Sequence, residues 1–125
     1  MVQVVDNSGA VLVRCIRLLR GCKINSATVG NYIVGSVQKV ASFKLTKKNK
    51  AKKTIAPGDI CKALIICSST RKKRFGTMSY KTDKNSIILV ADNFLPTSNR
   101  IVGPAFLELR KAKQLKVLSL ADYVL

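Results

Sequence analysis

The sequence predicts a mainly β protein, a small closed barrel of about five short strands followed by one late helix. Three observations carry this prediction. Short β-branched apolar segments recur between turn residues. Gly35 interrupts one of them, which indicates a bulge or tight curvature. Only one segment, near the C-terminus, has a helix start signal. At 125 residues we expect one domain over 1–125, with a basic loop at 43–54, a hairpin at 70–82 and a helix at about 104–114.

The first three strands are predicted from alternating apolar and polar residues and from the turn residues that bound them. Met1 to Val5 alternates as a strand and stops at Asp6-Asn7-Ser8-Gly9, whose short polar side chains and glycine are typical of a turn. Val11 to Leu19 resumes as a strand, and Tyr32 to Val40 forms the third.

The segment Ile60 to Cys67 predicts a strand in the middle of the core. It is apolar on both faces apart from Lys62, and the turn signal Pro57-Gly58-Asp59 precedes it. The chain then becomes strongly basic, and Phe75 to Met78 supplies the bend of a hairpin. Because four adjacent cations repel one another and isolated hairpins are marginal in water, we expect this hairpin to become ordered only when the phosphates of a binding partner neutralise them. Asn85 to Ala91 is a further core strand.

The C-terminal region holds the predicted helix. Pro104 suits a first helical position, and basic residues near Gln114 suit a helix C-terminus. Leu115 to Leu120 is expected to be a short strand or an extended segment, and Ala121 to Leu125 a short apolar tail that docks on the rest of the chain.

The charge balance predicts an anionic partner. The chain has 23 Lys and Arg against 6 Asp and Glu, and a net charge of +17. This excess far exceeds what solubility needs. The stretch from Asn7 to Gly58 contains many Lys and Arg but no Asp or Glu. The candidate residues for binding this partner are the clustered cations Arg14, Arg17, Arg20, Lys23, Lys44, Lys47, Lys48, Lys50, Lys52, Lys53, Arg71, Lys72, Lys73, Arg74, Arg100, Arg110, Lys111 and Lys113.

Two of these clusters have a plainer interpretation. The lysine tract from Lys44 to Lys53 is expected to stay extended or disordered in the free protein and to bind phosphates, but it could also be a solvated loop. The arginines of the second strand, Arg14 and Arg17 with Arg20, could also form a solvated face, but the absence of a nearby acid favours contact with an anion.

The sequence lacks the residue patterns that catalysis, metal binding or insertion into a membrane would need. The sequence has no His to act as a general base and no phosphate-binding glycine motif. Its four cysteines include no C-x-x-C pair, so we expect small core hydrophobes, no metal and no cofactor. Apolar runs are too short for a membrane span. Because the first basic residue is Arg14, no cleavable presequence is expected. We therefore predict no enzyme activity, no small-molecule substrate and no membrane association.

An ordered set of motifs resembles the large-subunit ribosomal protein L-fourteen family. VDNSGA opens the set at Val5, and KKTIAPGDICKALII follows from Lys52. DKNSIILV begins at Asp83, RIVGPAFLELR begins at Arg100, and LKVLSLADYVL ends the chain. The resemblance covers essentially the whole chain in the family's order.

The resemblance implies a five-stranded barrel with a projecting β-hairpin and a short C-terminal helical portion. It further implies a structural constituent of the large ribosomal subunit that binds large-subunit rRNA and small-subunit rRNA at an intersubunit bridge. Implied protein neighbours are of the L-three and L-nineteen type, together with a ribosomal silencing factor. The C-terminal pattern and the sequence drift indicate a mitochondrial ribosome, with a bacterial cytoplasm or a plastid as alternatives.

The chain departs from the family pattern at several positions. The lysine tract is longer than usual, and the hairpin tip has Lys73-Arg74-Phe75-Gly76-Thr77 where the family has Arg-Arg-Pro-Asp-Gly. Asp122 replaces a usual proline.

A second function, from a different class, is a free single-strand-binding barrel of the OB type. Such proteins stack bases on aromatic side chains. Aromatic residues make up only 6% of this chain, and Trp is absent, so the composition favours the ribosomal function.

Overall fold

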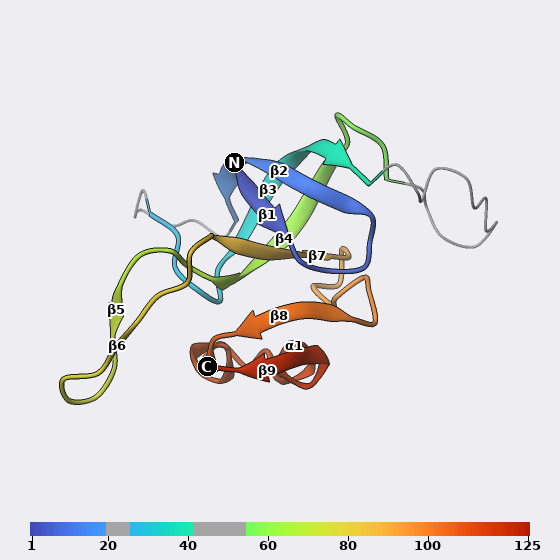
Figure 1. Ribbon diagram of the computed structural model, residues 1–125. Helices are drawn as coiled ribbons and strands as arrows, with labels where there is room; N and C mark the ends of the chain where they lie inside the picture. The colour runs from blue at the N-terminus through green and yellow to red at the C-terminus, as the bar shows by residue number, and fades with distance from the viewer. Residues whose placement is uncertain (20–25, 42–54) are drawn as a thin grey trace.

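Five strands close into a barrel, as the sequence predicts. The computed structural model describes residues 1–19, 26–41 and 55–125. Around the barrel the order is β1-β2-β3-β4-β7, and a parallel pairing between β1 and β7 closes it (Figure 1). The strands are β1 (Val2–Val4), β2 (Ala10–Leu18), β3 (Tyr32–Val40), β4 (Ile60–Cys67) and β7 (Ser86–Val90).

Strands β4 and β7 are apolar on both faces because each faces two cores. Ala63 and Ile87 point into the barrel, where they join Val13, Ile33 and other buried side chains. Their neighbours Leu64, Ile66, Ile88 and Val90 point the other way and pack against the C-terminal portion of the chain. Ile60, at the start of β4, is 73% exposed and belongs to neither core.

The glycine in β3 lies where two strands approach closely. The β2–β3 pairing changes register between Cys15 and Arg17, opposite Gly35. A Cβ at Gly35 would collide with the Val13 side chain and would lie 2.8 Å from the carbonyl oxygen of Arg14. The expected curvature at this glycine is therefore present, and it requires the absence of a side chain.

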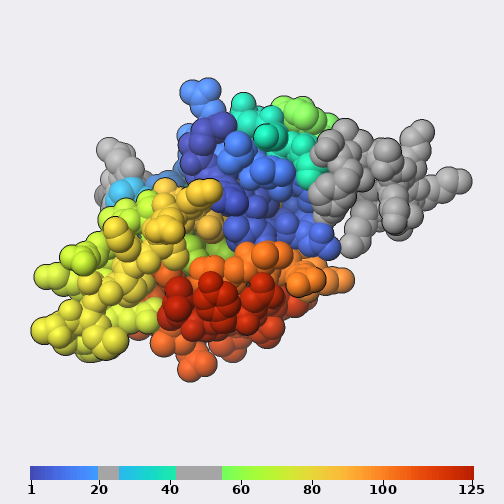
Figure 2. Space-filling model, viewed as in Figure 1, coloured from blue at the N-terminus to red at the C-terminus, as the bar shows by residue number. Residues whose placement is uncertain are grey.

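The hairpin leaves the barrel between β4 and β7. Its strands are β5 (Lys72–Lys73) and β6 (Ser79–Tyr80), paired antiparallel. The amide of Arg74 donates to the carbonyl of Met78 at 3.0 Å, so the bend lies between these two residues, as predicted. The hairpin extends away from the barrel and lies beside the C-terminal portion (Figures 1 and 2).

The predicted helix at 104–114 is wrong, and so is the predicted strand at 115–120. Pro104 lies in strand β8 (Ile101–Ala105), which is followed by a 3₁₀ turn, η2 (Leu107–Arg110). The α-helix, α1, is Leu115–Leu120. The tail does dock: β9 (Ala121–Val124) pairs in parallel with β8. One short helix near the C-terminus is therefore present, but further along the chain than expected.

The strand at Pro104 has a physical reason. Gly103 has a φ of 109°, which is not helical, and Pro104 lies opposite Tyr123 in the β8–β9 ladder. The register of this ladder shifts between Ile101 and Pro104. The carboxylate of Asp122 accepts a hydrogen bond from the amide of Gly103 at 3.1 Å. Residues of β8 therefore find their partners in the C-terminal tail, which a helix prediction based on Pro104 alone does not consider.

Candidate nucleic-acid interface

The structure describes ten of the eighteen candidate RNA-binding residues. The lysine tract is outside the described residues, as are two cations of the loop after β2; these are Arg20, Lys23, Lys44, Lys47, Lys48, Lys50, Lys52 and Lys53. The described candidates fall into three groups, one on the barrel, one on the hairpin and one on the C-terminal portion.

On the barrel, Arg14 and Arg17 are exposed on β2. The strand pairing aligns Arg17 with Val34 of β3, and Val34 with Lys62 of β4. The Lys62 ammonium lies 2.9 Å from the Asp92 carboxylate, so its charge is already paired. Neither arginine forms an ion pair with any residue that the structure describes, which leaves both guanidinium groups available for an anion.

In the hairpin, Arg74 differs from its three basic neighbours. Its Nε and Nη2 donate to the two carboxylate oxygens of Glu108 in η2, at 2.6 and 2.9 Å. Its guanidinium also lies 4.1 Å from the ring centre of Tyr80. Tyr80 in turn meets the buried ring of Phe106 edge-on at 4.6 Å. Arg74 therefore fastens the hairpin to the C-terminal portion, a role that its place in a run of cations did not predict.

The contact with Arg74 lowers the pKa of the Glu108 carboxyl. Two hydrogen bonds from a guanidinium stabilise the ionised carboxylate, and they lower the pKa of Glu108 to about 2. The same hydrogen bonds raise the pKa of Arg74. The pair is charged throughout the physiological range.

The other hairpin cations remain unpaired within the described part of the chain. Arg71 and Lys73 are exposed, and Lys72 is partly exposed. At the bend, Phe75 is 93% exposed and Met78 is 74% exposed. Beside the Arg74–Glu108 pair, an open hollow of about 420 Å³ lies between the hairpin and η2, and Lys73, Phe75, Leu107 and Lys111 are among its lining residues. The hairpin thus presents both charge and apolar surface.

The remaining candidates lie on the C-terminal portion. Arg100 precedes β8, while Arg110, Lys111 and Lys113 belong to η2 and the turn after it. Arg100, Arg110 and Lys111 are exposed. Lys111 and Lys73 line the same hollow, so the fold brings two distant basic clusters together, while Arg14 and Arg17 belong to the barrel.

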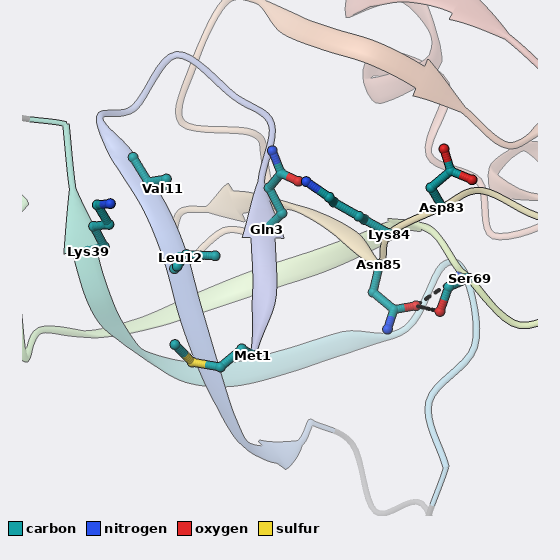
Figure 3. A pocket seen from close by; sticks show the side chains of 9 residues that line it. All are labelled: Met1, Gln3, Val11, Leu12, Lys39, Ser69, Asp83, Lys84 and Asn85. Atoms are coloured by element: carbon teal, nitrogen blue, oxygen red, sulfur yellow. Dashed lines mark hydrogen bonds between the residues drawn. The ribbon is translucent and has the colours of Figure 1, made fainter.

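Two further cations, which the sequence does not single out, also share a hollow. Lys39 of β3 and Lys84, just before β7, line an open depression of about 470 Å³ on the outside of the barrel (Figure 3). Each lies outside the basic clusters, and only the strand order β3-β2-β1-β7 brings them to one surface. No local sequence signal marks them.

The cysteines have different environments. Cys67 is fully buried, and burial raises the pKa of its thiol to about 11, so it is protonated at neutral pH. Cys61 is partly buried, whereas Cys15 is exposed, contrary to the expectation of a core residue. Cys22 lies outside the described residues.

Two other kinds of site have no candidate in the described ranges. Across residues 1–19, 26–41 and 55–125, no three His, Cys, Asp or Glu side chains are grouped so as to hold a metal ion. None of the helices described in those ranges is long and apolar enough to cross a membrane.

Comparison with known proteins gives a consistent result. Residues 1–125 match the family described as ribosomal protein L14p/L23e. The chain is 37% identical to the large ribosomal subunit protein uL14m of Acanthamoeba castellanii, over all of this chain and 95% of that protein. It is 38% identical to the protein of the same name from Acanthamoeba polyphaga, over 88% of this chain and 92% of that protein.

Proposed function

The chain belongs to the ribosomal protein L14p/L23e family, and from that premise we propose that it binds large-subunit rRNA and contributes to the intersubunit bridge region during translation. The match over residues 1–125 carries the proposal, because this family and the names of both relatives support a structural constituent of the large ribosomal subunit. Its place is the mitochondrial ribosome, as the mitochondrial large-subunit names of both relatives support.

The physical basis of the proposed binding is a rigid barrel that carries unpaired cations. Although β2 is exposed from Arg14 to Arg17, its pairing with β3 continues through these residues. Arg14 and Arg17 are therefore held on a surface that does not need to fold on binding. Contacts of this kind release counterions from the RNA and give an affinity that falls steeply with salt. The lysine tract would add phosphate contacts of the same type.

The other proposed partners fit particular surfaces. The exposed Phe75 and Met78 make the hairpin bend suitable for a protein neighbour of the L-three or L-nineteen type. Small-subunit rRNA at the bridge and a ribosomal silencing factor are further proposed partners, which the resemblance to the family implies.

The test of rRNA binding compares two cations on one row of the barrel. We expect Arg17→Gln to weaken binding to a large-subunit rRNA transcript and to reduce the slope of log affinity against log salt by about 1, the value for one lost phosphate contact. Lys62→Gln removes the same charge two strands away, but Lys62 is paired with Asp92. We therefore expect a smaller change in slope. Filter binding over a salt series measures both.

Two outcomes would contradict the proposal in different ways. An unchanged slope for Arg17→Gln would remove Arg17 from the interface. Equal changes in the two variants would mean that only total charge matters and that no surface is selected.

A further inference from the structure

The hollow between Lys39 and Lys84 has the composition of a nucleotide site. Strand pairing places Lys39, Leu12, Gln3 and Ser86 in one row across β3, β2, β1 and β7. Three inter-strand spacings make this row about 14 Å long. Gln3 lies between Val2 and Val4, which pack into the barrel core, so its own side chain points outward into the hollow.

The floor of the hollow is apolar and its two ends are cationic. Met1, Val11 and Leu12 form the apolar part (Figure 3). Lys39 and Lys84 lie on opposite sides of Leu12 and Gln3 in this view, and neither forms an ion pair with a described residue. A planar base can stack on apolar side chains, and ammonium groups on either side suit the phosphates that flank it.

A fixed amide completes the site. The Oδ1 of Asn85 accepts hydrogen bonds from the amide and the hydroxyl of Ser69, at 2.9 and 3.1 Å. These two bonds orient the carboxamide, so its nitrogen lies on the side away from Ser69 (Figure 3). Among the described residues this nitrogen has no acceptor. It can therefore donate to a ring nitrogen or carbonyl oxygen on the edge of a base.

We propose that this hollow holds an unpaired nucleotide of RNA, with the base on Leu12 and Val11, the base edge at Asn85 and the adjoining phosphates at Lys39 and Lys84. Duplex RNA would not fit, because its bases are stacked and paired, whereas RNA-binding proteins read bases that are splayed out of loops and bulges. The carboxylate of Asp83 also lines the hollow. It suits an exocyclic amino group and disfavours a phosphate at its own position. The inference rests on the proposed rRNA binding and names the kind of nucleotide that this surface takes.

The first test changes the amide donors and leaves their support intact. Asn85→Asp keeps an oxygen that can accept from Ser69 but removes both N–H donors. Gln38→Glu is the matched control, since it makes the same amide-to-carboxylate change on β3 at an exposed residue outside the hollow. With a large-subunit rRNA transcript as the probe, we expect Asn85→Asp to weaken binding by about tenfold, as the loss of a good base contact does. The control should change affinity much less.

The second test locates the contact directly and does not depend on the stability of the first variant. Val11→p-benzoylphenylalanine places a photocrosslinker in the hollow, and primer extension on the irradiated complex maps the attached nucleotide. We expect one predominant stop at an unpaired nucleotide.

The outcomes separate this inference from the proposed function. If the unsubstituted protein does not bind the transcript, both fail. If it binds but Asn85→Asp binds as well as Gln38→Glu, or if crosslinks reach only paired nucleotides, the nucleotide site is wrong and rRNA binding stands.

Discussion

At the scale of single residues, two acids have roles in holding the fold together. Asp6, in the predicted turn, accepts hydrogen bonds from the amide and hydroxyl of Ser8 and from the amide of Leu89 at 2.7 Å. It therefore joins the β1–β2 turn to β7. Glu108 joins η2 to the hairpin through Arg74. The sequence predicts the turn at Asp6, because its signal is local. It does not predict either long-range partner, because Leu89 and Arg74 are distant in the chain.

The pairing of Glu108 predicts how stability depends on pH. Its folded pKa is lowered to about 2, from 4.5 for a free carboxyl. Its contribution is therefore fully present above about pH 4.5 and is lost as the pH falls toward 2. Glu108→Gln should lower the free energy of unfolding by about 1–2 kcal/mol at neutral pH, and by progressively less in acid. Urea unfolding at several pH values measures the difference.

The control for this prediction is the exposed ion pair. Asp92 is 99% exposed in its pair with Lys62, so Asp92→Asn should change stability little. A difference between the unsubstituted protein and Glu108→Gln that stayed constant from neutral pH to acid would contradict the assigned ion pair.

At the scale of elements, the barrel strands were predictable and the C-terminal portion was not. Strands β3 and β4 have the predicted bounds, because β-branched runs between turn residues can bury themselves only as strands. Pro104, after Gly103, is compatible both with the first position of a helix and with a strand. Its pairing with β9 decided the outcome. That pairing joins residues about twenty positions apart, and no local pattern reports it.

The candidate site shows the same division between local and long-range information. Clusters such as Arg71 to Lys73 are visible in the sequence, and the structure leaves these residues unpaired within the described ranges. Lys39 and Lys84 cannot be found from the sequence, because strand order alone brings them to one hollow. Arg74 resembles a binding residue in the sequence because its ion-pair partner is remote along the chain.

The hairpin provides a prediction at this scale. Charge repulsion alone predicts that RNA is needed to order it, but Arg74 and Tyr80 fasten it to η2 and Phe106. In free protein we therefore expect slow amide exchange at Arg74 and Thr82, which donate to Met78 and Ser68. Exchange should be fast at the exposed bend residues Gly76 and Thr77.

Amide exchange followed by NMR distinguishes these two possibilities. Uniformly fast exchange from Arg71 to Thr82 in the free protein would show that the contacts at Arg74 do not order the hairpin in the absence of RNA. If the contacts at Arg74 do order it, Glu108→Gln should speed exchange at Arg74 but leave β4 and β7 protected.

At the scale of the whole molecule, a chain with a net charge of +17 contains a barrel that two cores hold rigid. Burial supplies the stability, so the surface can carry cations such as Arg14 and Arg17, which no acid in the described ranges neutralises. This division suits a protein whose binding partner is RNA and whose own fold must persist within a large assembly. The lysine tract lies outside the described residues, and its binding to phosphates remains a prediction from its charge.

The most direct measurement of the central claim is sedimentation of the native protein in a sucrose gradient of lysed mitochondria, at low and then at high salt. We predict that the protein migrates with the large ribosomal subunit at both, because an integral subunit component is enclosed by rRNA and protein neighbours. A free strand-binding barrel would instead leave the subunit fractions at high salt, since its affinity is electrostatic. Release of the protein to the top of the high-salt gradient, with the subunit itself intact, would contradict its assignment as an integral component of the large subunit.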